Sequence, residues 1–287
     1  MIDLHFHSTY SDGKLSVPEL AELIKARGLK YCALTDHDTV AGVIELQKCL
    51  EGTDIKVIPG VELTALDGDN EIHVLAYDFD VEVVEKILEE RNNDIRRRQK
   101  NEEMQKAINL FKQEGIKISD SLIPVAKQPV GRTLAVDICQ HEVNQDLFLK
   151  RHGKILTPDE IYFEYQAIGK SCAVKRSGVS VEWLIENFKN KVGNLILAHP
   201  FVQISIATRA LTENNILSLL DRGLNGVEIY HDKTSPNQIE WLNKLIEQRK
   251  LPYTGGSDFH GNQNDLALGL YGLNLEIPNF ELKKLQF

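Results

Sequence analysis

The stretch Tyr31-Cys32-Ala33-Leu34-Thr35-Asp36-His37-Asp38 joins a short apolar run directly to a group of polar side chains. A run of this length and composition predicts a buried β-strand over Tyr31–Thr35. Amphipathic segments of helical length stand on both sides of it, at Val17–Arg27 and Val40–Leu50. A strand between two helices is typical of βα units, in which functional side chains gather at the C-terminal ends of the strands.

The same alternation of strand and helix recurs along most of the chain. The predicted strands are Ile2–Leu4, Tyr31–Thr35, Lys56–Val61, Glu71–Tyr77, Leu195–Ala198, Gly226–Ile229 and Pro252–Thr254. The predicted helices are Val17–Arg27, Val40–Leu50, a helix from Val81 onward, Val181–Asn190, Glu213–Asp221 and Pro236–Arg249. The pattern predicts an α/β fold with a largely parallel sheet.

The alternation stops between residues 81 and 180, where the sequence is helical and highly charged without a convincing strand. A chain of 287 residues is long enough for two domains or for one large α/β barrel that carries an insertion. We therefore predict a discontinuous barrel domain over residues 1–80 and 181–287. Residues 81–180 are predicted to form a helical insertion that covers the mouth of the active site.

Composition and charge exclude several classes of protein. Hydrophobic residues make up 42% of the chain and charged residues 26%, which is the balance of a chain with a sizeable core and excludes disorder. The longest apolar runs are strand-sized, and the first residues lack the features of a signal peptide, so we expect a cytoplasmic protein with no membrane span. The net charge of −9 disfavours a scaffold for duplex DNA or other nucleic acid.

The four cysteines do not form a metal-binding or disulfide pattern. Cys32, Cys49, Cys139 and Cys172 are widely spaced and none belongs to a CxxC pair. We expect reduced, buried thiols.

Histidine and carboxylate side chains recur at or beside the predicted strands. His5 and His7 stand at positions i and i+2 at the end of the first strand, where alternation points both side chains to the same side. Similar groups follow other strands, and recurrence favours a shared site over isolated core histidines. The candidate metal ligands are His5, His7, Asp12, His37, Glu62, His73, His199, Asp258 and His260.

Nine nitrogen and oxygen ligands exceed the four to six positions of one ion, so two or three divalent ions are predicted. Imidazole together with carboxylate suits Mn, Zn or Fe. A cationic centre of this kind favours hydrolysis of phosphate esters, because it holds phosphoryl oxygens, generates hydroxide at neutral pH and stabilises the leaving oxygen.

At these residues the chain resembles the PHP (polymerase and histidinol phosphatase) family of metal-dependent phosphoesterases. The resemblance rests on His5–Gly13 (HFHSTYSDG), Thr35–Thr39 (TDHDT), Pro59–Glu62 (PGVE) and Gly256–His260 (GSDFH). It implies a distorted (β/α)7 TIM-like barrel with an inserted helical subdomain and a trinuclear metal site at the C-terminal face of the strands.

The resemblance also implies how the ligands are shared among three ions. One ion takes His5, His7, Glu62 and Asp258. A second ion takes Asp12, His37 and His260. A third takes Glu62, His73 and His199, so that Glu62 bridges two ions.

Within the family, the insertion and the order of motifs are most similar to the subgroup of nucleoside monophosphate and 3′,5′-bisphosphate phosphatases and 5′-to-3′ exoribonucleases. The implied substrate is a nucleoside 5′-monophosphate or 3′,5′-bisphosphate, or a short RNA 5′ end. That subgroup carries Gly-Arg-Pro-His in the insertion, whereas this chain has Gly131-Arg132-Thr133-Leu134. Arg132 is the first candidate for substrate binding, since a guanidinium binds phosphate with two donors.

Further candidates for substrate contact lie near the end of the insertion and after it. Lys175 and Arg176 are predicted to attract the anionic substrate. His231 follows the strand Gly226–Ile229 in a segment that resembles the Glu-x-Tyr-His segment of the family, and is predicted to contact either a metal ligand or the leaving group. Glu62, Asp258 and His231 are the candidate catalytic residues.

Two other functions remain as alternatives. One is a metal-binding PHP module with a regulatory role and little turnover, and the other is a metal-dependent amidohydrolase. A complete ligand set and the absence of a polymerase-like segment in 287 residues favour the phosphoesterase. The native metal, the exact substrate, the choice between monoester and diester, and the oligomeric state do not follow from the sequence.

Overall fold

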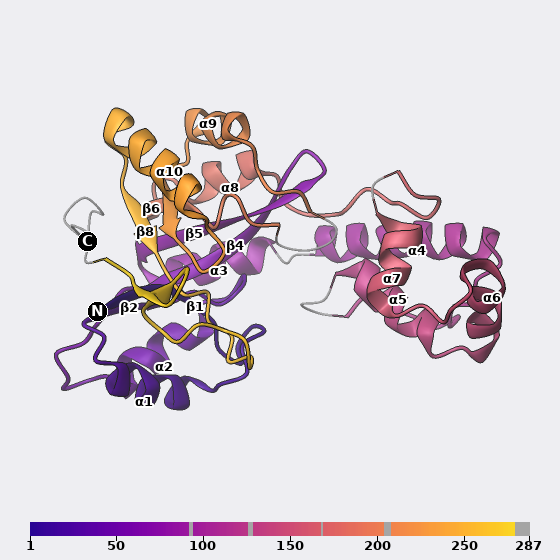
Figure 1. Cartoon of the computed structure of the whole chain (residues 1–287), viewed down its shortest axis with the longest axis horizontal. Helices are drawn as coiled ribbons and strands as arrows, with labels where there is room; N and C mark the ends of the chain where they lie inside the picture. Colours follow the sequence, from indigo (N-terminus) through magenta and orange to yellow (C-terminus); the bar gives the residue numbers. More distant parts are fainter. Residues whose placement is uncertain (92–93, 126–128, 168, 204–207, 279–287) are drawn as a thin grey trace. The chain divides into compact units, whose positions relative to one another are not determined.

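The computed structural model describes residues 1–91, 94–125, 129–167, 169–203 and 208–278. The chain forms two compact units, whose elements are labelled in Figure 1. The first unit contains Met1–Glu90, Val179–Val202 and Ala210–Phe287, and the second contains Arg91–Gly178 and Gln203–Arg209. Residues 92–93, 126–128 and 168 of the predicted insertion lie outside the described residues.

The first unit contains all strands of the described chain. Its elements are β1 (Ile2–Phe6), α1 (Val17–Arg27), β2 (Tyr31–Leu34), α2 (Ala41–Cys49), β3 (Lys56–Val57), β4 (Gly60–Asp67), β5 (Asn70–Phe79), α3 (Val81–Arg91), α8 (Val181–Phe188), β6 (Val192–Leu197), α9 (Glu213–Arg222), β7 (Gly226–Tyr230), α10 (Pro236–Arg249), β8 (Tyr253–Gly255), β9 (Leu270–Tyr271) and β10 (Leu275–Glu276). Helix α3 belongs here, although the sequence placed it in the insertion, because Val84, Ile87 and Leu88 share the core of this unit.

The helices begin and end where the sequence predicted them to within two residues, and α1 illustrates why. Val17, Leu20, Ala21 and Ile24 are buried at positions i, i+3, i+4 and i+7, so one face of the helix meets the core. The helix starts with a capping box formed by Ser16 with Glu19, and Gly28 ends it in the left-handed region at φ 69°.

The strands form two larger sheets and one small hairpin. The order is β1-β2-β3 in the first sheet and β4-β5-β6-β7-β8 in the second, while β9 pairs with β10. β1, β2 and β3 are parallel, and so are β6, β7 and β8. The mixed α/β class is thereby confirmed, whereas closure into a seven-stranded barrel stays a prediction.

The expectation of a largely parallel sheet is wrong around β5, which is antiparallel to both β4 and β6. Two residues, Gly68 and Asp69, connect β4 to β5. A parallel pair needs a crossover of a dozen or more residues, so this loop permits only a hairpin. Gly68 adopts a φ of 64° at the first position of the loop, where a tight hairpin turn favours glycine, and the Gly68-Asp69 pair is a sequence signal for such a turn.

The predicted strand Lys56–Val61 is also corrected, because it is divided into β3 and the start of β4. Pro59 stands between them and has no N–H to donate to a neighbouring strand. The chain thereby leaves the first sheet after Val57 and enters the second at Gly60.

The two sheets meet where their strands end, and the candidate site lies at this junction. The backbone N–H of Asp258 donates to the carbonyl of His5 at 2.8 Å, which joins β1 to the segment after β8. The backbone N–H of Asp38 donates to the carbonyl of Glu62 at 2.8 Å, which joins the end of β2 to β4. These bonds bring residues from four distant parts of the chain side by side.

Buried apolar side chains fix this framework from both faces. Val61 and Val74 of the second sheet share one core with Leu184, Leu219 and Leu242 of α8, α9 and α10. A separate core lies between the first sheet and the helices α1 and α2, which lie together in Figure 1. The sheets are therefore rigid supports for the side chains at their ends.

The second unit has a hydrophobic core of its own. Its described elements are α4 (Asp94–Gln113), α5 (Val130–Cys139), α6 (Glu142–His152), α7 (Pro158–Ile161) and a π-helical segment, Tyr162–Gln166. Met104, Phe111, Leu134, Phe148 and Tyr165 are buried against one another. Its described residues form helices and no strand.

All four cysteines are free. Cys32 and Cys172 are buried, but Cys49 and Cys139 are partly exposed, so the prediction of buried thiols is wrong for two of the four. Among the described helices, none combines the length and the apolar composition that crossing a membrane requires.

Candidate metal centre

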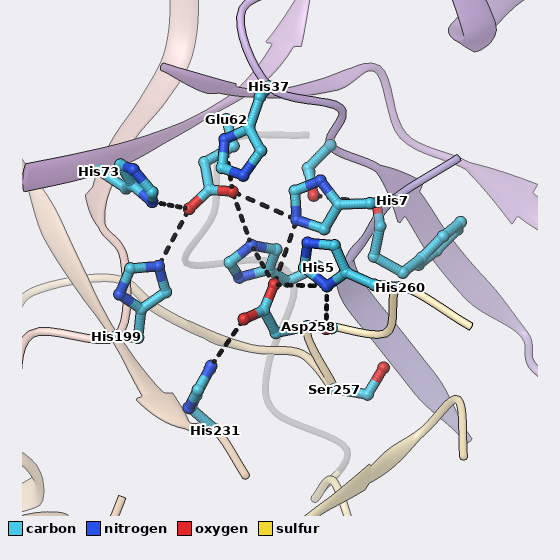
Figure 2. Close-up of polar contacts among 12 residues, drawn as sticks. His5, His7, His37, Glu62, His73, His199, His231, Ser257, Asp258 and His260 are labelled. Atoms are coloured by element: carbon cyan, nitrogen blue, oxygen red, sulfur yellow. Dashed lines mark hydrogen bonds and ion pairs between the residues drawn. The ribbon is translucent and has the colours of Figure 1, made fainter. Parts of the chain in front are cut away.

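The carboxylate of Glu62 lies at the centre of a histidine cluster in the first unit (Figure 2). The side chain is 1% exposed and comes from β4. Its Oε2 lies 3.2 Å from His5 Nε2, His7 Nε2 and His37 Nδ1, and its Oε1 lies 2.9 Å from His73 Nδ1 and 3.0 Å from His199 Nε2. One carboxylate thus faces five imidazoles that come from four different parts of the chain.

Asp258 supplies a second carboxylate next to Glu62. Its Oδ1 lies 3.1 Å from His7 Nε2 and 3.4 Å from His5 Nε2. Its Oδ2 lies 3.3 Å from Nε2 of His231, a fully buried residue at the end of β7. His231 thereby contacts a candidate ligand.

Asp12 and His260 complete the cluster on its open side. Asp12 Oδ1 lies 3.4 Å from His260 Nε2, and the Asp12 carboxylate lies 3.7 Å from both His7 Nδ1 and His37 Nε2. The side chain of Asp12 is 56% exposed, in contrast to the buried Glu62. The cluster is therefore open to solvent on the side of Asp12.

All nine candidate ligands lie in this one cluster, and the donor atoms of eight of them, all except His199, form three overlapping groups. In each group the atoms lie within 4.8 Å of one another. The groups are His7, Asp12, His37 and His260; His5, His7, Glu62 and Asp258; and His37, Glu62 and His73. The second group has the members that the family resemblance implied for one ion, whereas His37 stands in the third group where the resemblance implied His199.

The unsatisfied donor atoms of the cluster fit divalent ions. His5 Nε2, His7 Nδ1, His37 Nδ1, His73 Nδ1 and Glu62 Oε2 are buried and have no hydrogen-bond partner. A buried polar atom without a partner costs about 1–3 kcal/mol, so several that face one another need a shared partner. Nitrogen and oxygen donors without thiolate suit Mn, Zn or Fe.

Burial and neighbouring charge act against each other in this cluster. Burial opposes ionisation of Glu62, but the imidazoles of His37, His73 and His5 hold its pKa well below the ordinary value. Burial likewise opposes the charged form of His7, yet its bonds to Asp258 and Glu62 raise its pKa to about 9. His37 is different, because burial lowers its pKa to about 4. The carboxylates therefore remain charged and attract cations into the cluster.

Two acidic residues in the loops and strands around the cluster hold its backbone in place, and neither was among the predicted site residues. Asp36 accepts hydrogen bonds from Ser8 N at 2.8 Å, Ser8 Oγ at 2.6 Å and Ser11 Oγ at 2.5 Å, which orders the loop before Asp12. Asp3 accepts from Ser257 Oγ at 2.6 Å, next to Asp258.

Burial raises the pKa of Asp3 to about 6, although the hydrogen bonds that Asp3 accepts, among them the one from Ser257, act to lower its pKa. A third acidic residue, Glu228, accepts a bond from the backbone N–H of His199 at 2.8 Å and lies 3.0 Å from His5 Nδ1. An acidic side chain inside an otherwise apolar strand, as at Asp3 and Glu228, is the signal that would have found two of these three.

Three of the six non-glycine residues that have a positive φ in the described chain lie beside the cluster. Asp38, His199 and Asp258 adopt φ values of 53°, 25° and 52°, in the region that side chains other than glycine rarely enter. Such residues persist only where the surrounding contacts hold them, and they are typical of functional sites.

The predicted phosphate-binding cations lie in the second unit. Arg132 stands on α5, is about half exposed, and its Nη1 lies 2.5 Å from Asp159 Oδ1. Lys175 is exposed and Arg176 is partly buried. Substrate binding by these three residues stays a prediction.

The PHP domain family matches residues 3–167, which is more than half of the chain and contains His5, His7, Asp12, His37, Glu62 and His73. The chain belongs to the PHP domain family. Two curated relatives cover nearly the whole chain. A 5′-3′ exoribonuclease of Haemophilus influenzae is 28% identical over 90% of this chain and 89% of its own length. A 3′,5′-nucleoside bisphosphate phosphatase of Chromobacterium violaceum is 26% identical over 90% of this chain and 87% of its own length.

Two solved structures agree with this chain in fold. A protein of Bifidobacterium adolescentis with a proposed metal-dependent phosphoesterase activity superposes with a TM-score of 0.63 at 24% identity, over 96% of this chain and 92% of its own. An amidohydrolase of Chromobacterium violaceum with bound sulfate gives 0.62 at 22% identity, over 97% and 92%. These two likenesses support the fold, and the curated relatives place the chain among the phosphoric ester hydrolases.

Metal binding should stabilise the protein measurably. Adding Mn²⁺ or Zn²⁺ at about 100 times its dissociation constant to chelator-treated protein contributes about 2.7 kcal/mol, which corresponds to a rise in Tm of roughly 5–10 °C. Thermal unfolding monitored by circular dichroism measures the shift. Ca²⁺ is the control and should shift Tm less, since it prefers oxygen ligands. Equal shifts with all three ions would contradict a histidine-rich site.

Proposed function

We propose that the chain hydrolyses a phosphate ester of a nucleotide: a nucleoside 5′-monophosphate, a 3′,5′-bisphosphate or a short RNA 5′ end. The observation that carries the proposal is the Glu62 carboxylate between five imidazoles, with three overlapping groups of metal-binding atoms around it. Adjacent cations are suited to phosphate esters, whose oxygens carry the charge that such ions neutralise.

The residues that would hold the ions are His5, His7, Asp12, His37, Glu62, His73, His199, Asp258 and His260. When bound, divalent ions supply Lewis acidity toward phosphoryl oxygens and lower the pKa of water. Glu62 connects the groups, because its two oxygens face different histidines. We propose two or three ions of Mn, Zn or Fe.

His231 positions one of the carboxylates. Its Nε2 lies 3.3 Å from Asp258 Oδ2, which leaves Asp258 Oδ1 directed toward His7 and His5. The imidazole of His231 is fully buried. We therefore assign it the orientation of Asp258 and not a contact with the leaving group.

The substrate approaches from the exposed side of the cluster. Asp12 is 56% exposed, and the side chains of His37 and His260 are partly exposed beside it. The phosphate would enter here, while Glu62 and His5 lie on the buried side. Arg132, Lys175 and Arg176 are proposed to bind the rest of the substrate.

The nucleotide as substrate class is supported by the names of the relatives. An exoribonuclease and a nucleoside bisphosphate phosphatase both act on nucleotide phosphate esters. A further relative from Eggerthella lenta, 25% identical over 90% of this chain, is named a phosphoribosyl 1,2-cyclic phosphate 1,2-diphosphodiesterase. A small phosphorylated molecule with a ribose is common to these names.

A substrate screen tests the proposal. Protein reconstituted separately with Mn, Zn and Fe is incubated with nucleoside 5′-monophosphates, 3′,5′-bisphosphates and 5′-phosphorylated oligoribonucleotides, and released phosphate and mononucleotide are measured. We expect turnover of at least one class and a rate that depends on the 3′-phosphate. Full metal occupancy without turnover of any substrate would favour the regulatory module instead.

A further inference from the structure

Glu228 is a buried acidic residue that lies outside the proposed ligand set. It belongs to β7, where its neighbours Val227 and Ile229 pack into the apolar core, and its side chain is fully buried. Burial of a carboxylate is unfavourable unless the charge is paired or hydrogen-bonded. The buried carboxylate of Glu228 therefore requires polar partners, and its contacts identify them.

Each oxygen of Glu228 contacts a different part of the metal centre. Oε1 lies 3.0 Å from Nδ1 of His5 in β1. Oε2 accepts a hydrogen bond of 2.8 Å from the backbone N–H of His199, directly after β6. One side chain thus connects two candidate ligands that are far apart in the sequence.

The contact with His5 decides which ring nitrogen can bind a metal. A carboxylate only accepts hydrogen bonds, so Nδ1 of His5 must carry a proton. Nε2 of His5 has no hydrogen-bond partner and lies 3.2 Å from Glu62 Oε2 and 3.4 Å from Asp258 Oδ1. In the neutral Nδ1–H tautomer the lone pair is on Nε2, which faces the place where the ions would bind.

The contact with His199 holds a strained backbone. His199 has a φ of 25°, and the bond from its N–H to Glu228 helps to keep it there. In this conformation His199 Nε2 lies 3.0 Å from Glu62 Oε1. Without the bond, the backbone is free to relax and to move the imidazole away from Glu62.

The charge of Glu228 supports the same role. Within the described part of the chain, its ion-pair partner is His5, and no lysine or arginine lies within ion-pair distance. A buried carboxylate whose ion-pair partner is an imidazole is typical of carboxylate–histidine–metal arrangements, in which the cation compensates the charge through the ring.

We propose that Glu228 is a positioning residue of the metal centre, which fixes His5 as the Nδ1–H tautomer and holds His199 so that both present Nε2 beside Glu62. The inference rests on the proposed function, because it requires that ions bind at this cluster. It adds a residue that acts through the ligands and touches neither ion nor substrate.

Glu228→Gln tests the proposal. The amide has nearly the same shape, but only its oxygen can accept, so one of the two bonds is lost together with the charge. We expect the dissociation constants for Zn²⁺ and Mn²⁺, measured by competition with a chelator, to rise about 10- to 100-fold. Unchanged dissociation constants would overturn the proposal.

Thr254→Val is the matched control. Thr254 is the cross-strand neighbour of Glu228 in β8 and is also fully buried, and valine has nearly the same shape. We expect this variant to bind metal as the wild type does. An equal loss of affinity in both variants would show that any disturbance of the strand pair weakens binding, and would overturn a specific role of the carboxylate.

A measurement on the wild-type protein does not depend on how the variant folds. In the Zn²⁺-loaded full chain, ¹⁵N NMR identifies which nitrogen of His5 carries the proton. We expect Nδ1 to carry it, and a proton on Nε2 would overturn the proposal. Failure of the wild type to bind Zn²⁺ or Mn²⁺ at all would instead contradict the proposed function.

Discussion

Replacing Glu62 by glutamine is expected to lower kcat by about 1000-fold, which corresponds to a loss of roughly 4 kcal/mol of transition-state stabilisation. The carboxylate faces His5, His7 and His37 with one oxygen and His73 and His199 with the other. Glutamine removes the charge shared by these groups and leaves the shape of the buried side chain nearly unchanged. Steady-state kinetics on the best substrate of the screen, together with metal analysis, measures the effect.

His260→Ala is the comparison for Glu62→Gln. His260 lies at the exposed end of the cluster beside Asp12 and belongs to one group of metal-binding atoms, whereas Glu62 belongs to two. We expect the Glu62 variant to lose more bound metal and more activity. Equal metal content and comparable rates in the two variants would show that Glu62 does not bridge.

Arg132→Ala is expected to reduce kcat/KM by about 10- to 1000-fold while metal content stays unchanged. A guanidinium that binds the substrate phosphate contributes about 1.5–4 kcal/mol through charge-assisted hydrogen bonds. Arg132→Lys should recover part of the activity, since an ammonium group cannot form the planar two-donor contact. Kinetics with saturating metal separates this effect from metal loss.

The ion pair of Arg132 provides the control. In the structure Arg132 pairs with Asp159 at 2.5 Å, and both side chains are about half exposed or more. An exposed pair contributes little to stability, so Asp159→Ala should keep kcat/KM close to the wild-type value. Similar losses in both variants would show that Arg132 serves the ion pair alone, and Lys175 or Arg176 would become the next candidate.

Local sequence patterns were sufficient for most helices and several strands. The period of apolar residues in α1, the capping box at Ser16 and Gly28 at its end determine the helix from neighbouring residues only. Helix α10 begins with Pro236, which suits a first helical turn, and its bounds were also predicted correctly. Signals of this kind act within a few residues and need no tertiary partner.

The antiparallel direction of β5 was not predicted, because the direction of a strand is not determined by its own residues. The strand Glu71–Tyr77 was recognised from its apolar residues, but strand direction depends on how the chain returns to the sheet. The two-residue loop at Gly68 and Asp69 permits only an antiparallel return, and the pairing of β5 with β6 then follows in space. Apolar composition carries no information about this choice.

The sequence predicted nine residues that the structure brings into one cluster, because they stand within or after the strands and because their chemical types agree. The tertiary structure decided what holds them in place. Glu228 and Asp3 are two acidic residues in apolar strands, and their partners His199 and Ser257 lie 29 and 254 residues away. Hydrogen bonds between such distant residues form only after the two sheets meet, so the sequence predicted the members of the cluster and the fold determined their geometry.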